Sequence, residues 1–470
     1  MEFRSIDGTG NNPAQPGFNA AGGAFTRLGE AHFADADGAL VAGANPRAIS
    51  NLVVGEGDAA VPIGQGLSGM MYAWGQFIDH DMTRSASGGA DIGIVVPDGD
   101  PDFPNGTVIP MTRNLIDPAT GNAIDRVTGW LDASMVYGSD PATAAALRMP
   151  DGRMATSEGD NLPVAPDGST FLAGDIRAGE NPSLTSLQTL FVREHNRQVD
   201  LLHAADPLLG GDALYDQARA IVGAEISRIT YDEFLPHLLG QGAIAAYAGY
   251  DAAVDSRLSV EFAGAAYRWG HSTVSAETER KDEAGAVVGE GFELRDVFFM
   301  PPADFAADGG AGGFLRHLGS DLSQAMDARI VDDLRNFLFD PPVGLDLAAI
   351  NIQRGRDLGL GTLNQTRQAL GLAAYTAFEQ ITDDAGTVAG LRAAYAGVDA
   401  IDLWTGGLAE RLTPGAFLGE TFGRITADQF AALRDGDRLF YLNQGFDAAT
   451  LNTIQHTSES LAKLLVAPGV

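Results

Sequence analysis

Apolar residues recur at helical spacing along most of this chain, and strict alternation of apolar and polar residues is rare. A helix is expected over 66–84, where the bulky apolar residues between Met70 and Ile78 share one face. A longer amphipathic helix is expected over 184–205, because residues 181–183 (Asn-Pro-Ser) form a helix-start signal. The periodicity predicts further helices over 140–149, 211–248, 255–274, 321–338, 358–372, 386–396 and 424–436.

The segments between these helices are long. Residues 1–65 read as an irregular arm rich in Gly, Asn, Pro and Ala, and 85–125 read as a long loop punctuated by Gly and Pro. The stretch 276–300 is expected to form a short hairpin or strand pair. Because no Pro/Ser-rich linker divides the chain, we expect one large, mostly α-helical domain over residues 1–470, with long loops and little β structure.

Composition and charge narrow the possible functions. The chain has 470 residues, of which 62 are acidic and 30 basic, for a net charge of −32. Such a negative surface repels phosphate backbones and anionic lipid, so nucleic-acid and membrane-surface binding are not expected. With no cysteine, disulfides, thiolate metal sites and a cysteine nucleophile are excluded. No apolar run approaches a membrane span, and the first residues do not resemble a signal peptide, so any export signal is expected to lie outside this chain.

A first candidate for chemistry lies in the helix expected over 66–84. Helical geometry places Gln76, Asp79 and His80 within one arc of about 100°, and Asp81 about 100° beyond His80. One face therefore offers an amide, a carboxyl and an imidazole, and the next offers a second carboxylate. The alternative interpretation is an ordinary solvated helix face.

A second candidate lies in residues 128–134, where oxygen-bearing side chains occur at Thr128, Asp132 and Ser134 and Trp130 can offer its carbonyl. Calcium prefers six to eight hard oxygen ligands, so these residues need a remote carboxylate to complete a site. The alternative is a turn held by side-chain hydrogen bonds.

Three more segments carry polar residues that ordinary structure would also explain. Residues 175–181 could be a loop leading into a helix, and 351–357 could be a charged loop. His271, near the end of a predicted helix, could be a hydrogen-bonded core histidine. Residues 193–197 lack zinc-site spacing and are interpreted as helix surface with internal ion pairs.

Taken together and in this order, these segments resemble the animal-type haem peroxidase family. The matching blocks are GQFIDHD at 75–81, DASMVYGS at 132–139, LAGD at 172–175, LTS at 184–186 with REHNR at 193–197, and NIQRGRD at 351–357. The resemblance runs from FRSIDG at 3–8 to RDGDR at 434–438, nearly the whole chain. It implies haem b bound between central helices.

The resemblance also implies roles for individual residues around the haem. His80 would be the distal base, with Arg177 as the distal guanidinium and Gln76 lining the pocket. His271 would be the axial iron ligand, with Asn351 accepting a hydrogen bond from its other nitrogen. Asp79 and Glu180 match the carboxylates that esterify the haem. Arg268 and Arg354 match arginines that pair with the haem propionates. The Ca²⁺ shell matches Asp81, Thr128, Trp130, Asp132 and Ser134.

This chain departs from the family pattern at three points. Asn181 stands where some members carry a methionine that forms a sulfonium link to haem, which implies weak oxidation of chloride. Trp130 replaces the usual phenylalanine, and the disulfides of the family cannot form here.

The function expected from the resemblance is a peroxidase that reduces hydrogen peroxide. Its donors would be halides or thiocyanate, with bromide and iodide favoured over chloride, or small phenols, oxidised through compound I. Two alternatives stay open: a fatty-acid dioxygenase, which would need a tyrosyl radical beside the haem (Tyr267 and Tyr137 are present), and a non-catalytic haem-binding or adhesion module. We expect a secreted or extracytoplasmic protein, and the sequence leaves its oligomeric state open.

Overall fold

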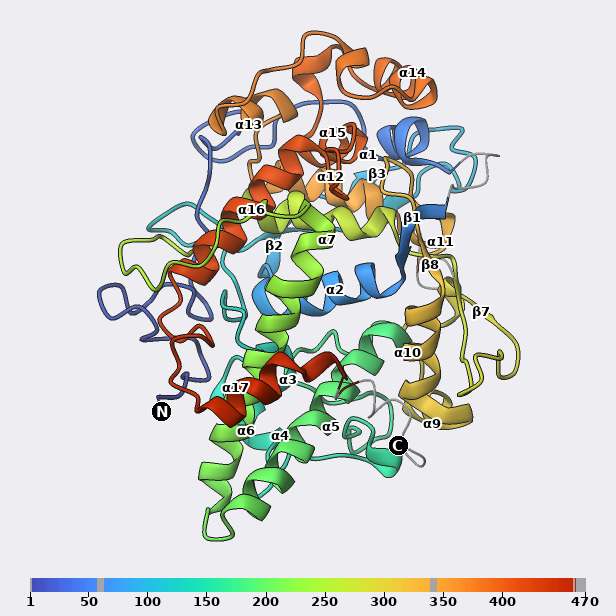
Figure 1. Ribbon diagram of the computed structural model, residues 1–470. Helices are drawn as coiled ribbons and strands as arrows, with labels where there is room; N and C mark the ends of the chain where they lie inside the picture. The colour runs from blue at the N-terminus through green and yellow to red at the C-terminus, as the bar shows by residue number, and fades with distance from the viewer. Residues whose placement is uncertain (1, 57–62, 339–344, 460, 462–470) are drawn as a thin grey trace.

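The computed structural model describes residues 2–56, 63–338, 345–459 and 461. Helices hold 44% of the residues and strands 10%, which confirms the mostly α-helical prediction. Figure 1 shows α2 (Met70–Met82) across the middle of the molecule. Below it lie α5 (Pro182–Ala205) and α6 (Gly211–Ile229), and above it lie α12 (Leu347–Asp357) and α16 (Glu420–Asp435).

The remaining helices complete these two groups. A π-turn over Thr230–Phe234 continues α6 into α7 (Leu235–Leu239). A 3₁₀ segment over Ala266–Ser272 follows α8 (Val260–Gly264) and packs against α2 and α16. The other helices are α1 (Pro46–Ile49), α3 (Ser134–Tyr137), α4 (Pro141–Leu147), α9 (Pro302–Ala306), α10 (Gly310–Ser320), α11 (Asp332–Arg335), α13 (Leu363–Ala369), α14 (Ala385–Ala394), α15 (Leu403–Ala409) and α17 (Ala448–Gln455).

The strands form only short antiparallel pairs within the described residues. The pairs are β1 (Ile63–Ser68) with β8 (Leu322–Gln324), β2 (Ser87–Asp91) with β5 (Thr112–Asn114), β3 (Ile94–Val95) with β4 (Val108–Ile109), and β6 (Glu277–Thr278) with β7 (Phe292–Glu293). The last pair confirms the hairpin expected within 276–300. The second and third pairs give the predicted loop over 85–125 a ribbon structure.

Several predicted helices are confirmed, with shifted ends. Asn181 caps α5 as expected, because its Oδ1 accepts a hydrogen bond from the Leu184 amide at 2.9 Å. The helices expected over 140–149, 386–396 and 424–436 are α4, α14 and α16. The helix expected over 211–248 ends at Leu239, because Gly240 takes a left-handed φ of +87°.

Other predictions are wrong. The first residues of the helix expected over 66–84 belong to β1, and the stretch 321–338 holds β8 and the short α11 rather than one helix. Both errors have the same cause, because β1 and β8 pair with each other across about 250 residues. The helix expected over 255–274 is split into α8 and the 3₁₀ segment, and only 363–369 of 358–372 is helical. The arm over 1–65 contains α1 and a π-helical turn, Ser50–Val54.

The interpretation of 193–197 as helix surface is also wrong. Arg193, Glu194 and His195 are buried, because α6 and neighbouring loops cover this face of α5. His195 Nδ1 lies 2.9 Å from the Tyr137 hydroxyl, and its Nε2 lies 2.9 Å from the Gly152 carbonyl oxygen. The internal ion pair does exist, between Glu194 and Arg197 at 2.7 Å.

Candidate active site

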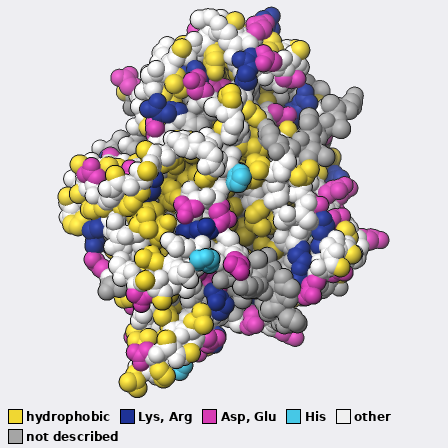
Figure 2. Space-filling model, viewed as in Figure 1, with side chains coloured by type: hydrophobic (Ala, Val, Ile, Leu, Met, Phe, Trp, Pro, Cys, Tyr) yellow, Lys and Arg dark blue, Asp and Glu magenta, His cyan; other side chains and the backbone are white. Residues whose placement is uncertain are grey.

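A cavity opens between α2 and the 3₁₀ segment that follows α8. It encloses about 1210 Å³, including its opening to solvent. In Figure 2 the molecule is hollowed over the middle of this face, where hydrophobic, acidic, basic and histidine side chains meet. The predicted residues that line the cavity are Gln76, Asp79, His80, Arg177, Glu180, Arg268 and His271. The fold thus brings together three segments, at 76–80, 177–180 and 268–271, which together extend over nearly 200 residues of the sequence.

The imidazole of His80 lies on the α2 wall of the cavity and is 4% exposed. Burial, followed by the charge of Arg177, lowers the pKa of His80 to about 3, so the ring is neutral at pH 7. Its Nδ1 lies 3.9 Å from Asp175 Oδ1 and has no hydrogen-bond partner among the described residues. A neutral imidazole with a free nitrogen can take up a proton and return it.

The guanidinium of Arg177 is fixed in the same wall. Its Nε and Nη2 donate to the two carboxylate oxygens of Asp175 at 2.7 and 2.9 Å, and Nη2 also donates to the Thr83 carbonyl at 2.9 Å. Burial alone would raise the pKa of Asp175, but the adjacent guanidinium outweighs it and brings the pKa to about 2. Asp175 therefore stays ionised and holds Arg177 in place.

Asp175 depends on a close backbone approach. A side chain at Gly174 would meet the backbone of Gly138 and Ser134 at 2.4 Å, so the chain can pass here only as glycine. Asp175 lies in the LAGD motif at 172–175, but the sequence alone predicts no role for it. The sequence feature that could have revealed Asp175 is the position of this acidic residue two residues before Arg177, in a chain with few basic residues.

A chain of amides and carboxyls runs along the cavity beside His80. Gln76 Nε2 donates to Glu180 Oε1 at 3.3 Å, and Asn181 Nδ2 donates to Gln76 Oε1 at 3.0 Å. Burial raises the pKa of Glu180 to about 7. Burial also raises the pKa of Asp79, whose Oδ1 accepts a hydrogen bond from Thr83 Oγ1 at 2.8 Å. Two carboxyls in one apolar cavity are costly as charges, and ester formation or protonation would remove that cost.

His271 lies on the opposite wall, in the 3₁₀ segment. Burial and the nearby Arg268 lower the pKa of His271 to about 3, so this ring is also neutral. Its Nδ1 lies 2.8 Å from Asn351 Nδ2, and Asn351 Oδ1 accepts a hydrogen bond from Arg268 Nη1 at 2.8 Å. The predicted contact between His271 and Asn351 is present, but the amide nitrogen rather than the oxygen faces the ring.

Arg354 does not line the cavity. Its Nη1 donates to the Thr112 carbonyl at 3.0 Å and pairs with Asp357 at 2.7 Å. Its role toward a propionate remains a prediction, whereas Arg268 is in the cavity wall.

A second polar cluster lies directly behind α2. Asp81 Oδ2 accepts hydrogen bonds from the Asp132 and Ala133 amides at 2.9 Å, and Ser134 Oγ donates to the Asp81 carbonyl at 2.8 Å. Thr128 Oγ1 donates to Asp132 Oδ1 at 2.8 Å, while the other oxygen, Oδ2, is buried with no hydrogen-bond partner among the described residues. Burial and the neighbouring Asp132 raise the pKa of Asp81 to about 8.

This cluster fits a cation, because two buried carboxylates and a free oxygen lie among hydroxyl and carbonyl oxygens. Four of the five predicted calcium ligands are joined by the contacts just described. Trp130, the fifth, is buried beside them. Its side chain donates a hydrogen bond from Nε1 to the Gly8 carbonyl at 3.1 Å, and its own backbone carbonyl takes no part in that contact.

Comparisons with known proteins identify the family to which this chain belongs. The family model described as animal haem peroxidase matches residues 3–468. The chain is 32% identical to peroxinectin A of Dictyostelium discoideum over 94% of this chain and 89% of the relative, and 33% identical to chorion peroxidase of Drosophila melanogaster over 96% and 64%. It thus spans less than two thirds of the chorion peroxidase.

Solved structures show the same fold. Peroxidase A of Dictyostelium discoideum has a TM-score of 0.89 at 29% identity, covering 99% of this chain and 98% of that one. A fatty acid alpha-dioxygenase of Arabidopsis thaliana has a TM-score of 0.85 at 22% identity, covering 98% of this chain and 80% of that one. At that identity the second likeness shows the fold alone. No helix among the described residues is long and apolar enough to cross a membrane.

Proposed function

The chain belongs to the animal haem peroxidase family, whose members are haem-dependent peroxidases, and from this premise we propose that the cavity between His80 and His271 binds haem b and reduces hydrogen peroxide. The observation that carries the proposal is the pair of neutral imidazoles, His80 buried and His271 half-buried, on opposite walls of one cavity. The bound group supplies the iron at which peroxide is reduced.

The distal residues handle the protons of peroxide. His80 is neutral because burial lowers its pKa, so a nitrogen of its ring can accept the proton that peroxide loses and return it to the departing oxygen. Arg177 has a fixed guanidinium beside it, which stabilises negative charge as the O–O bond breaks. Asp175 contributes by holding Arg177 and by lying within 4 Å of His80.

The proximal residues hold the iron. His271 must bind through a lone pair on Nε2, which requires the proton on Nδ1, and the partner of that proton must then be an acceptor. Asn351 can accept only if its amide turns from the orientation described above. Arg268, which now donates to the amide oxygen, would be released toward the cavity, where it could meet a propionate.

We further propose that Asp79 and Glu180 form ester links to the haem and that the cluster around Asp81 and Asp132 binds Ca²⁺. Two half-buried carboxyls facing the cavity support the first assignment, and the unpartnered Asp132 oxygen supports the second. Asn181, an amide hydrogen-bonded to Gln76, cannot form a sulfonium link, so bromide, iodide, thiocyanate and small phenols are proposed as better donors than chloride. A secreted or extracytoplasmic location is likewise proposed from the relatives.

One observation keeps a second candidate function. Tyr267 lines the cavity, and its buried hydroxyl has no hydrogen-bond partner among the described residues. A fatty-acid dioxygenase needs a tyrosine beside the haem, whereas Tyr137 is excluded because it packs against His195 away from the cavity.

A single set of assays tests these proposals. Haem-loaded protein should show a Soret band and should oxidise bromide, iodide or a phenol only when peroxide is present. Oxygen uptake with a long-chain fatty acid in the absence of a halide donor, abolished by Tyr267→Phe, would instead establish the dioxygenase. A chain that binds haem but supports neither reaction would refute both.

A further inference from the structure

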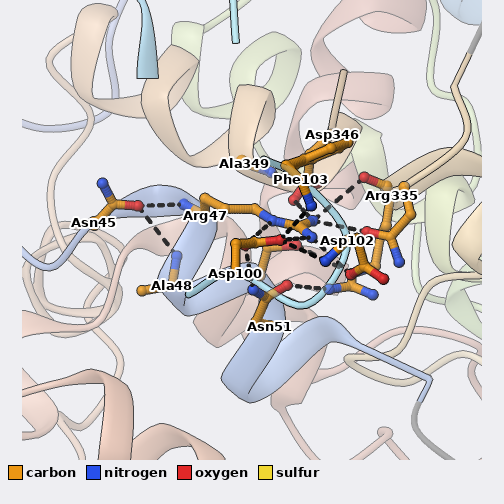
Figure 3. Close-up of polar contacts among 12 residues, drawn as sticks. Asn45, Arg47, Ala48, Asn51, Asp100, Asp102, Phe103, Arg335, Asp346 and Ala349 are labelled. Carbon is orange, nitrogen blue, oxygen red and sulfur yellow. Dashed lines mark hydrogen bonds and ion pairs between the residues drawn. The ribbon is translucent and has the colours of Figure 1, made fainter. Parts of the chain in front are cut away.

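Arg47, at the start of α1, is an arginine with a fully buried side chain that does not line the cavity. All five of its N–H donors have acceptors (Figure 3). Nε and Nη2 donate to the two oxygens of Asp100 at 2.8 and 3.0 Å, and Nη2 also donates to Asp102 at 2.9 Å. Nη1 donates to Asp346 at 2.8 Å and to Asn336 Oδ1 at 2.9 Å.

These contacts require an arginine. The guanidinium also lies 4.5 Å from the centre of the Phe103 ring, so one planar group binds three carboxylates and stacks on an aromatic side chain. An ammonium cannot reproduce the paired contacts to Asp100 because its donors are not arranged as a fork. Arg47 therefore joins the N-terminal arm to the loop over 85–125 and to the start of α12.

The contact with Asp346 leads toward the active site. Asp346 is the N-cap of α12: its Oδ1 accepts a hydrogen bond from the Ala349 amide at 3.0 Å, while its Oδ2 binds Arg47. Asn351 lies in the first turns of the same helix, where its amide contacts His271. One carboxylate thus connects the buried guanidinium to the helix that carries the partner of the proximal histidine.

The arm holds the other end of α12 as well. Arg356, in the last turn of the helix, donates to the Ala44 carbonyl at 2.8 Å, three residues before Arg47. Residues 44–47 therefore span α12 from its cap to its last turn, and a change in their position would shift the helix as a unit.

We propose that Arg47 is a positioning residue for the proximal histidine, acting through Asp346 and α12 on the contact between Asn351 and His271. This inference rests on the proposed role of His271 as the axial ligand. Loss of the guanidinium leaves Asp100 and Asp346 as buried carboxylates without their cation, so the cap of α12 must move toward water or another donor. The hydrogen bond on His271 Nδ1 changes as a result.

A matched control is available in the same cluster. Arg335 is also buried, at 3% exposed, and its side chain binds Ser50, Asn51 and Asp332, but it does not contact Asp346. Arg335→Gln should lower stability to a similar extent without reaching α12 through its cap.

The experiment compares Arg47→Gln, Asp346→Asn, their double variant and Arg335→Gln as haem-loaded, ferrous proteins that have never met peroxide, so that the haem is not yet ester-linked and can be released. The readouts are the iron–histidine stretching band in resonance Raman spectra, which reports the hydrogen bond on the axial imidazole, and the rate of haem release. We expect both single variants to shift the band and to release haem about 10-fold faster or more. The double variant should show no larger change than either single one. Asparagine is a good N-cap, so Asp346→Asn gives the readout even if Arg47→Gln does not fold.

The inference is overturned if Arg47→Gln and Asp346→Asn lose thermal stability as Arg335→Gln does while the band stays at its wild-type position. Asn351→Ala distinguishes the proposed role of Arg47 from the proposed contact between Asn351 and the axial histidine. A shifted band in Asn351→Ala with none in the other two refutes the role of Arg47 alone. An unshifted band in Asn351→Ala shows that Asn351 does not bond the axial imidazole and refutes this inference, whereas an iron–histidine band that persists in His271→Ala refutes the ligand assignment itself.

Discussion

Calcium should stabilise this protein through Asp132, and the size of the effect can be worked out. At a free Ca²⁺ concentration 100 times the dissociation constant, binding to the native state alone adds about 2.7 kcal/mol to the free energy of unfolding. An unfolding entropy of about 2.1 cal/mol/K per residue, over 470 residues, makes 1 kcal/mol worth about 1 °C. The melting temperature should therefore rise by about 3 °C between chelator and saturating Ca²⁺.

The wild type and the variant Asp132→Asn should differ in their order of thermal stability between chelator and Ca²⁺. The variant removes one of two buried carboxylates, including the oxygen without a partner, so in chelator it should be at least as stable as the wild type. In Ca²⁺ it should be less stable, because a cation ligand is lost. Differential scanning calorimetry in both buffers measures this. Glu225→Gln changes another buried carboxyl, one for which no hydrogen bond or ion pair with Asp81 or Asp132 is described, so this variant serves as control and should keep the full calcium response. An Asp132→Asn protein with an unchanged calcium response would refute the assignment.

Three further predictions concern single side chains. Replacing His271 by Ala should abolish the native Soret band, whereas His80→Ala should keep haem and lose about 10²–10⁴-fold in peroxide-dependent turnover; normal spectra and turnover in both would contradict the assignment. Asn181→Met should red-shift the Soret band and raise chloride oxidation after peroxide treatment. A wild type that already oxidises chloride as readily as bromide would show that the missing methionine does not limit chloride oxidation. Burial and the adjacent Glu194 raise the pKa of Glu225 well above its usual range, so the native state binds this proton more tightly than the unfolded chain and loses stability as pH rises above about 4. Glu225→Gln should thus gain stability relative to the wild type between pH 5 and 9 in thermal melts, and a constant difference would show that Glu225 does not titrate in this way.

The cavity wall on α2 could be predicted from sequence because helix geometry alone decides it. Gln76, Asp79 and His80 lie on one face of the helix wherever that helix packs, and the structure places all three in the cavity wall. Arg177 and His271 are brought to the same cavity by the tertiary fold, and the sequence could place them there only through the resemblance to a family.

The helix α12 shows why local patterns fail elsewhere. Its second half, 351–357, reads as a charged loop because three of its seven residues carry charge. Two of the ion pairs are tertiary, Arg356 with Asp402 and Asp357 with Arg113, while Arg354 pairs with Asp357 one turn along the same helix. A helix buried by ion pairs on several sides has no apolar stripe for periodicity to detect.

Two adjacent residues of α2 link the predicted calcium site to the chemistry. His80 lines the cavity, while Asp81 binds the backbone of residues 132–133 on the other side of the helix. Because successive side chains on a helix differ by about 100°, any rotation of α2 that improves the surroundings of Asp81 turns His80 by the same angle. Proton transfer depends on placement to within a few tenths of an ångström, so the two sites cannot be adjusted independently. On the proposed function, the acidic cluster would therefore act on peroxide chemistry without contacting the cavity, by fixing the rotation of the helix that carries His80.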